Sequence, residues 1–228
     1  MRASKNIEML AVVARALRDL KHEVVFVGGA TVDIYVDEST APPLRATDDV
    51  DCVIEIASRM GYRQLEKKLV TLGFKHPIDE PQAPICRWKL GELKVDIMPT
   101  SEEVLGFSNR WYSEGMAKSM TVALPDGQEI RVLTLPYFVA TKIEAFRGRG
   151  KGDYLSSPDI EDILAVTDGA TDFTSLVAQA PTSVRDYLKT EIARFLSDQD
   201  FIDNAPGHLA ESPGSMRVER LFAALRAI

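Results

Sequence analysis

The sequence contains few of the residues that build disulfide frameworks or zinc sites. Two cysteines and three histidines occur among 228 residues. Cys52 and Cys86 lie far apart, without the CxxC spacing of a redox motif or a metal finger, and apolar residues typical of strands surround each of them. We therefore expect two reduced thiols in the core rather than a disulfide or a zinc site.

The chain also has no long apolar run and no excess of positive charge. No segment approaches the roughly 18 consecutive apolar residues of a membrane span, and the start does not have the pattern of a secretion signal. We expect a cytoplasmic protein without a membrane partner. The formal net charge of −7 argues against broad attraction to nucleic acid, although a local basic patch could still bind a phosphodiester backbone.

The first half of the sequence is rich in segments typical of strands. Apolar residues at three- and four-residue intervals predict an amphipathic helix over residues 5–20. Turn-forming residues at 91–92 and 125–127 predict two hairpins. Strands are expected at 24–27, 50–56, 85–90, 93–98, 119–124 and 129–133, and further helices at 30–35 and 58–72. Residues 37–47, which include two prolines, are expected to form a loop.

After Pro136 the apolar pattern becomes helical. Helices are expected at 136–147, 158–167, 173–178, 183–196 and 215–227. The segment from Gly148 to Ser157, with three glycines and several charges, is expected to be a connecting or binding loop. We therefore expect an α+β core domain over residues 1–134 and a helical domain over 135–228 that completes a cleft with it.

A pair of carboxylates stands at the start of one predicted strand. Asp49 and Asp51 alternate with apolar residues, so their side chains point to the same side of the strand. Two like charges side by side are unfavourable unless a cation lies between them. Oxygen ligands without a neighbouring histidine or cysteine favour Mg²⁺, with Mn²⁺ as the alternative, over zinc. A solvated strand end with turn-forming aspartates is the alternative interpretation.

A third carboxylate interrupts another apolar strand. Asp96 lies between a valine and an isoleucine, where a carboxylate requires a partner. Three carboxylates permit a two-metal centre, in which ions roughly 3.5–4 Å apart stabilise the attacking and the leaving oxygens. We therefore predict a metal site formed by Asp49, Asp51 and Asp96. An ion pair of Asp96 with Lys94 or Arg87 is the alternative.

Gly28 and Gly29 separate the first predicted strand from the helical segment that follows it. Because glycine has no Cβ, backbone N–H groups there can approach a phosphate, and the start of a helix adds a favourable field. An ordinary turn is the alternative interpretation of the pair. The position of the pair upstream of Asp49 favours the phosphate interpretation.

Together these segments resemble the nucleotidyltransferase signature of the DNA polymerase β-like superfamily. The matching segments are Val27-Gly28-Gly29-Ala30-x-x-Asp33, Arg45-x-Thr47-x-Asp49-Val50-Asp51 and Val95-Asp96-Ile97. The chain is most similar to the AbiEii-like branch, which includes toxins of type IV toxin–antitoxin systems, from about residue 20 to about residue 168. The resemblance implies a mixed sheet flanked by helices, Mg²⁺, an NTP donor, and nucleotide binding by Gly28, Gly29 and Thr47.

The same resemblance implies a later lysine and aspartate, for which Lys142, Asp159 and Asp162 are the matching residues. Lys142 shares a helical face with two phenylalanines, where its ammonium requires a buried anion such as a triphosphate. A lysine that extends along the rings to solvent is the alternative. Asp159 follows Ser157 and Pro158, so helix capping alone explains it. Asp162 comes one turn later, and the sequence does not decide between the two aspartates.

A basic segment follows Lys142. Arg147, Arg149 and Lys151 alternate with glycines and are expected to lie on a flexible loop. Such a loop could hold the triphosphate or the phosphates of an acceptor. A solvated loop without a ligand is the alternative.

The predicted reaction transfers a nucleoside monophosphate from an NTP to a hydroxyl acceptor. Asp49 and Asp51 would hold the metal on the triphosphate, and Asp96 would receive the acceptor's proton while pyrophosphate leaves. The expected acceptor is an RNA or tRNA 3′ end or a protein, and a toxin of this kind would have a cognate antitoxin as its partner.

Two other functions stay open. The glycine pair and the Asp-Asp-Val-Asp segment also resemble aminoglycoside-modifying nucleotidyltransferases, whose polycationic acceptor would suit a chain with a net charge of −7. The other alternative is a non-catalytic nucleotide-binding regulatory protein of the same fold. The presence of all three carboxylates argues against it.

Overall fold

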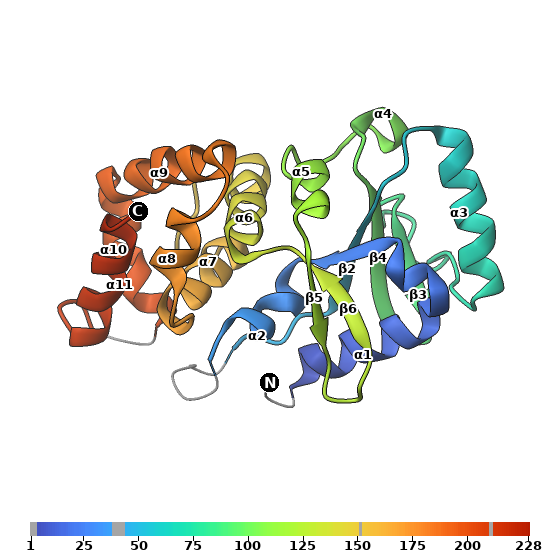
Figure 1. Ribbon diagram of the computed structural model, residues 1–228, viewed down its shortest axis with the longest axis horizontal. Coiled ribbons are helices and arrows are strands. Elements are labelled where there is room, and N and C mark those ends of the chain that lie inside the picture. Colours follow the sequence, from blue (N-terminus) through green and yellow to red (C-terminus); the bar gives the residue numbers. More distant parts are fainter. Residues whose placement is uncertain (1–3, 38–43, 151, 210–211) are drawn as a thin grey trace. The chain divides into compact units, whose positions relative to one another are not determined.

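The chain divides into two compact units (Figure 1). The computed structural model describes residues 4–37, 44–150, 152–209 and 212–228. Unit 1 comprises the described residues of Met1–Asp33 and Arg45–Thr134, and unit 2 comprises those of Ile34–Leu44 and Leu135–Ile228. The short segment after Asp33 therefore belongs with the C-terminal half of the sequence.

Unit 1 is an α+β unit built on one sheet. Its helical elements are α1 (Lys5–Leu17), η1 (Arg18–His22), η2 (Gly29–Thr31), the start of α2 (Val32–Tyr35), α3 (Arg59–Thr71), α4 (Glu102–Leu105) and α5 (Tyr112–Ala117). Its strands are β1 (Val24–Val27), β2 (Asp49–Ile54), β3 (Arg87–Leu90), β4 (Leu93–Pro99), β5 (Met120–Ala123) and β6 (Glu129–Val132).

The sheet is mixed, with the strand order β3-β4-β2-β1-β6-β5. Strand β2 pairs in parallel with β4 and antiparallel with β1, and β1 pairs in parallel with β6. The hairpins β3–β4 and β5–β6 form the two edges. Because β2 lies next to β4, residues more than forty positions apart in sequence become neighbours at the centre of the sheet, as Asp51 and Asp96 do.

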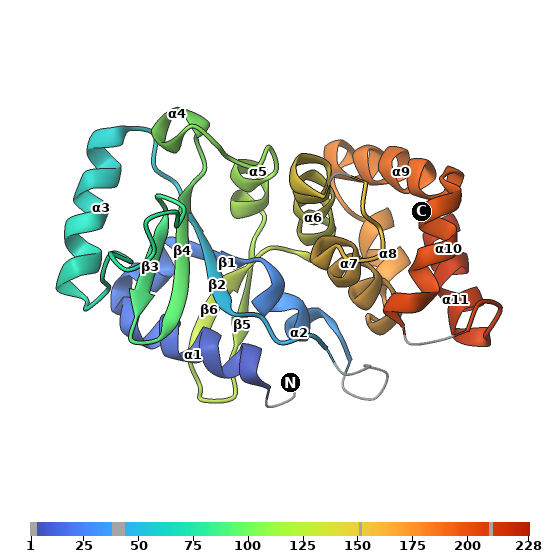
Figure 2. The same cartoon turned by 180° about the vertical axis from the view of Figure 1, so that it is seen from behind.

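Helices α1 and α3 pack beside this sheet (Figure 2). The Tyr62 hydroxyl of α3 donates to the carbonyl oxygen of Ile97 in β4 at 3.0 Å. Gln128, in the β5–β6 turn, donates from Nε2 to the carbonyl oxygen of Ala11 in α1 at 3.2 Å. Val50 and Cys52 of β2 are completely buried. Val50 and Cys52 thus point to one side of the strand, and Asp49 and Asp51 point to the other.

Unit 2 is helical. Its elements are the end of α2, α6 (Leu135–Arg149), α7 (Pro158–Gly169), α8 (Phe173–Ala178), α9 (Thr182–Ser197), α10 (Gln199–His208) and α11 (Met216–Arg226). Aromatic rings from four of its segments meet in the core: Phe195 and Phe201 stack with centroids 5.1 Å apart, and Tyr154 meets Phe146 at 5.1 Å. Within the described ranges, no helix is long and apolar enough to cross a bilayer.

The predicted α+β class with a mixed sheet and a helical C-terminal region is confirmed, and all six predicted strands are present. The helix predicted over residues 5–20 ends earlier, at Leu17, and continues as a 3₁₀ turn. Helices α4, α5 and α10 were not predicted. The predicted loop at 37–47 falls largely on residues 38–43, outside the described residues.

The predicted basic loop is wrong in its first part. Helix α6 continues through Arg149, so Arg147 and Arg149 lie on its last turn rather than on a loop. The helix ends where Gly150 contacts it closely, since a Cβ at Gly150 would lie 2.3 Å from Phe146 Cδ2. Lys151, the third basic residue of the predicted loop, lies outside the described residues.

Candidate active site

Three carboxylates meet on the sheet of unit 1. Asp49 and Asp51 project from the same side of β2, and the Cα of Asp51 lies opposite that of Asp96 in the parallel pair with β4. One oxygen from each carboxylate lies within 4.8 Å of the others. The three residues proposed from the sequence as metal ligands are thus neighbours in space.

Gly28 is required by its contact with one of these carboxylates. Its φ is +73°, and a Cβ placed on it would lie 2.0 Å from Asp51 Oδ2. Every other residue type would collide with the Asp51 side chain and would strain the backbone. The glycine therefore lets β1 end directly against Asp51, while Gly29 opens the turn η2 that follows. The predicted phosphate contact of both glycines remains a prediction.

A buried hydrogen-bond network fixes the start of β2. The Thr47 hydroxyl donates to the Asp49 carbonyl oxygen at 3.0 Å, and the Thr47 N–H donates to Asn6 Oδ1 at 3.0 Å. Asn6 in turn donates from Nδ2 to Asp33 Oδ2 at 2.7 Å. Thr47, predicted as a nucleotide ligand, is thus engaged with the backbone beside Asp49. Asn6 was not predicted as a site residue, although its polar side chain on the buried face of α1 is a signal for it.

Arg87 supplies a positive charge to the carboxylates. At the start of β3, it donates from Nε to Asp96 Oδ1 at 2.8 Å and from Nη2 to Asp96 Oδ2 at 2.8 Å. The same Nη2 lies 2.9 Å from Asp49 Oδ2. Of the two ion-pair partners considered for Asp96, the structure therefore pairs it with Arg87. Hydrogen bonding to Asp96, opposed by burial, raises the pKa of Arg87 above its already high usual value.

The two cysteines lie behind this cluster as free, buried thiols, as predicted. Burial, together with the nearby Asp96 and Asp51 charges, raises the pKa of Cys86 to about 12. Burial, with Asp51 and Asp96 adding to it, also raises the pKa of Cys52 well above its usual value. Both thiols are therefore protonated at neutral pH and supply no ligand or nucleophile.

The donor set fits a hard divalent cation. Mg²⁺ holds oxygens at roughly 2.1 Å in an octahedron, so opposed ligand oxygens lie about 4.2 Å apart. Neighbouring ligand oxygens lie about 3.0 Å apart, so the triad oxygens, within 4.8 Å of one another, need to close by up to about 2 Å for all three to share one ion. All three donors are carboxylate oxygens, which suit Mg²⁺ or Mn²⁺ better than zinc. The cluster is therefore compatible with a divalent metal.

A second charged cluster lies inside unit 2. Lys142 of α6 is 6% exposed, and its Nζ lies 3.2 Å from Asp159 Oδ1 and 2.6 Å from Asp162 Oδ2 on α7. Nζ also lies 5.9 Å from the centre of the Phe138 ring. The alternative of a lysine that extends to solvent is wrong, because the ammonium is buried. Both candidate aspartates contact it.

Arg149 completes this cluster. Its Nε donates to Asp159 Oδ2 at 2.9 Å and its Nη2 to Asp159 Oδ1 at 2.8 Å. Burial opposes ionisation of Asp159, but hydrogen bonds from Arg149 and the charge of Lys142 outweigh it, so the pKa of Asp159 is lowered. Arg147 instead lies 3.3 Å from Glu191 Oε1 on α9. Both arginines proposed for nucleotide binding thus contact carboxylates within unit 2.

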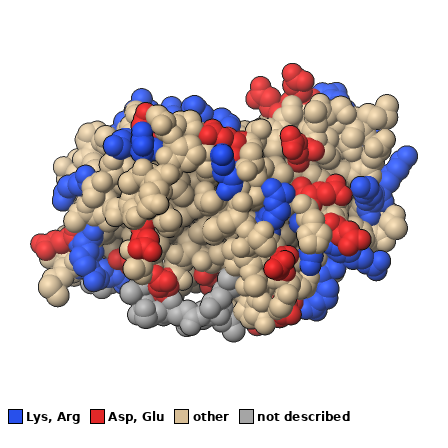
Figure 3. Space-filling model, in the orientation of Figure 1, with Lys and Arg blue, Asp and Glu red and all other residues tan. Residues whose placement is uncertain are grey.

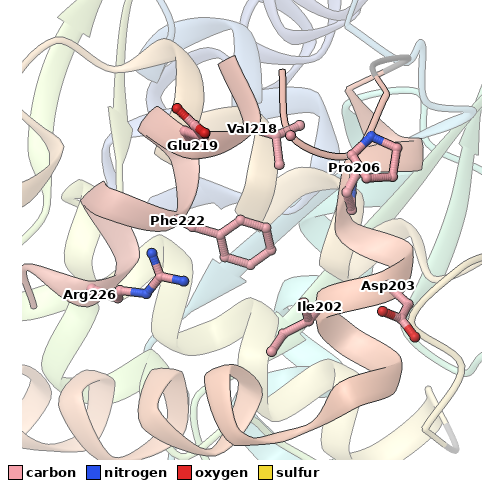
Figure 4. Close-up of a pocket in the computed structure, with 9 residues that line it drawn as sticks. Ile202, Asp203, Pro206, Val218, Glu219, Phe222 and Arg226 are labelled. Carbon is pink, nitrogen blue, oxygen red and sulfur yellow. The ribbon is translucent and has the colours of Figure 1, made fainter. Parts of the chain in front are cut away.

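Unit 2 also contains a cavity of about 690 Å³ between α10 and α11 (Figure 4). Apolar side chains such as Ile202, Val218 and Phe222 line it, with Asp203, Glu219 and Arg226 at its rim. Its lining includes none of the residues proposed from the sequence, so the cavity does not enter the candidate site.

The six-stranded mixed sheet and its helices define an α+β fold. The particular solved structure that the chain resembles is the solution structure of the antibiotic-resistance factor ANT(2'')-Ia, with a TM-score of 0.50 and 15% sequence identity. The match covers 84% of this chain and 95% of that one, and it shows the fold. No known family and no curated protein matches the sequence. The resemblance to the AbiEii-like branch therefore stays a prediction.

Proposed function

We propose that the protein is a metal-dependent nucleotidyltransferase that moves a nucleoside monophosphate from an NTP to a hydroxyl acceptor. The observation that carries the proposal is the meeting of Asp49, Asp51 and Asp96 on adjacent strands of a nucleotidyltransferase-like sheet. Gly28, at the end of β1, supports it, because a residue with a side chain at this position would collide with Asp51. The structural likeness to ANT(2'')-Ia, an aminoglycoside nucleotidyltransferase, supports the general reaction.

In this reaction an acceptor oxygen attacks the α-phosphorus, the bond from that phosphorus to the bridging oxygen breaks, and pyrophosphate leaves with the electron pair. Bound Mg²⁺ would neutralise the triphosphate and make the acceptor hydroxyl more acidic. Asp49 and Asp51 would hold this ion and, through it, the triphosphate of the donor nucleotide. A carboxylate oxygen of Asp96 would receive the acceptor's proton.

The roles of unit 2 are also proposed. The resemblance to AbiEii-like proteins implies catalytic roles for Lys142, Asp159 and Asp162. The basic segment that follows Lys142 suggests phosphate contacts by Arg147 and Arg149. The salt bridges in unit 2 support a narrower role for the first three: Asp159 and Asp162 hold the Lys142 ammonium at a fixed place on α6. Arg149, with 69% of its side chain exposed, keeps access to solvent and to a ligand.

We propose RNA as the acceptor, which fits a toxin-like cytoplasmic enzyme with a cognate antitoxin. On the face shown in Figure 3, basic and acidic side chains are interspersed. The RNA contact would therefore depend on local basic residues rather than on an extended basic surface. An aminoglycoside is the second candidate, favoured by the likeness to the antibiotic-resistance factor ANT(2'')-Ia and by the net charge of −7.

The test is transfer of an α-³²P label. The protein is incubated with Mg²⁺ and each labelled NTP, together with total cellular RNA in one set and with a panel of aminoglycosides in another. We expect label in RNA, and expect Asp49→Asn/Asp51→Asn to reduce transfer by at least about 10³-fold, because these carboxylates hold the charge on which the reaction depends.

The matched control is Asp48→Asn, which removes an exposed carboxylate next to the site; its side chain is 93% exposed. This variant should retain wild-type transfer. Label in an aminoglycoside but not in RNA would replace the first acceptor with the second. The absence of transfer in every set, together with the absence of metal-dependent NTP binding, would refute the proposed function.

A further inference from the structure

Arg87 occupies the oxygens that a metal ion in the triad would need. Its guanidinium forms a two-bond contact with both oxygens of Asp96 and a third contact with Asp49 Oδ2, all between 2.8 and 2.9 Å. The Arg87 side chain is 16% exposed and that of Asp96 is 10% exposed, so the contact is largely shielded from water. A guanidinium in this geometry is one of the stronger protein partners of a carboxylate.

The pairing is specific to Arg87 among the neighbouring cations. Lys89 and Lys94 lie further along the same two strands, with Cα atoms opposite each other. Lys89 pairs with Asp79 at 2.6 Å, and both lysines reach Glu80, at 3.1 and 3.5 Å. Their charge is therefore directed to the Asp79–Glu80 segment. The β3–β4 register brings Arg87, and not these lysines, to the triad.

One guanidinium does not balance three carboxylates. The formal charge of Asp49, Asp51, Asp96 and Arg87 is three negative against one positive, a sum of −2. A divalent ion added to these four residues would bring the sum to zero. The same carboxylate oxygens would then have to hold both Arg87 and the metal. Because Asp96 already accepts from Arg87 with both oxygens, Arg87 and the metal compete for Asp96 and for Asp49 Oδ2.

We propose that Arg87 is a displaceable counter-cation of the metal site, whose contacts with Asp49 and Asp96 must open before both carboxylates can bind metal. Arg87 is thus a positioning residue that holds the carboxylates together in the absence of metal and lowers their affinity for it. The inference rests on the proposed function, because it presumes that the triad binds a divalent ion.

The test is Mn²⁺ binding to the full-length protein, measured by calorimetric titration in the presence and absence of a non-hydrolysable NTP analogue. Arg87→Gln removes the charge and keeps a hydrogen-bond donor, so we expect its Kd for Mn²⁺ to fall at least tenfold. Arg87→Lys keeps the charge but loses the two-bond contact, and its Kd should fall two- to fivefold. Asp51→Asn/Asp96→Asn should bind no Mn²⁺.

The matched control is Arg15→Gln, which removes the same charge from α1, where Arg15 pairs with Asp126 of the β5–β6 turn at 2.9 Å. Its Mn²⁺ affinity should equal that of the wild type. Thermal unfolding gives a second measurement: without metal Arg87→Gln should melt below the wild type, and saturating Mn²⁺ should raise its Tm more than it raises that of the wild type. A purely structural arginine would lower the Tm without tightening Mn²⁺ binding.

The outcomes separate the two hypotheses. Mn²⁺ binding by the wild type with an equal or weaker affinity in Arg87→Gln would overturn the role of Arg87 and leave the metal site standing. If Arg87→Gln does not fold, an unchanged affinity in Arg87→Lys overturns the same role. No Mn²⁺ binding by wild type or variants, with or without nucleotide, would refute the metal site itself and the inference with it.

Discussion

The two charged clusters of this protein use the same kinds of residue but differ in charge balance and burial. In unit 1, one guanidinium faces three carboxylates, and the Asp49 side chain is 35% exposed. In unit 2, two cations, Lys142 and Arg149, face two carboxylates that are each at most 5% exposed. One cluster thus carries a formal excess of negative charge, whereas the other is balanced.

This difference separates what each cluster can do. A buried and balanced cluster gains its energy from internal contacts, and removal of one partner leaves an uncompensated charge in a medium that solvates it poorly. A partly exposed cluster with excess negative charge is held together against its own repulsion and gains energy when a cation enters. We therefore expect the unit 2 cluster to dominate stability and the unit 1 cluster to dominate ligand binding.

The largest effect on stability should come from Lys142→Met. The variant keeps the length of the side chain but removes the ammonium that lies 2.6 Å from Asp162 and 3.2 Å from Asp159. We expect the free energy of unfolding, measured by urea denaturation followed by circular dichroism, to fall by about 3–5 kcal/mol. Lys189→Met, at an exposed position on α9, should change it by less than about 0.5 kcal/mol. Equal effects of the two variants would mean that the unit 2 cluster is not a structural centre.

A smaller effect should appear in the pH dependence of the unfolding free energy, through Asp159 of unit 2. The pKa of Asp159 is lowered in the folded protein, so its contribution is present above the unfolded pKa of about 3.9 and is lost as pH falls through the folded value. Asp159→Asn lacks this proton linkage. Its deficit in unfolding free energy relative to the wild type should therefore be largest near pH 7 and shrink as the pH falls below about 3.9.

The control for the pH dependence is Asp186→Asn, at an aspartate whose side chain is 62% exposed. Its difference from the wild type should stay nearly constant over the same pH range. A deficit in Asp159→Asn that is also independent of pH would show that the carboxylate charge of Asp159 contributes nothing to stability.

The sequence contained enough information to place the carboxylates of unit 1 together. Alternation along β2 assigns Asp49 and Asp51 to one side, and Asp96 stands out because it interrupts an apolar strand. The strands themselves were predictable because β-branched runs and glycine turns are local signals. That Arg87 rather than Lys94 pairs with Asp96 depends on the register of β3 against β4, which is a tertiary property.

Other features depended on packing that local patterns do not encode. Helix α10 contains Pro206 and Gly207, which normally end helices, yet Asp198 caps its start and Phe201 is buried against neighbouring rings. Asp159 and Asp162 are both buried around Lys142 because α6 and α7 pack together. The local sequence of α7 therefore could not show which of the two aspartates contacts the lysine. Tertiary contacts override local propensity in both cases.

The smallest effect on stability should come from Asp51→Asn, which tests the charged cluster of unit 1. The substitution keeps the shape that Gly28 accommodates and leaves two carboxylates facing Arg87, so lost interactions are offset by relief of repulsion between like charges. We expect the unfolding free energy without metal to change by less than about 1 kcal/mol, in urea titrations run beside those of Lys142→Met. A loss as large as that of Lys142→Met would mean that the triad is a structural centre too, and the assignment of stability to one cluster and ligand binding to the other would fail.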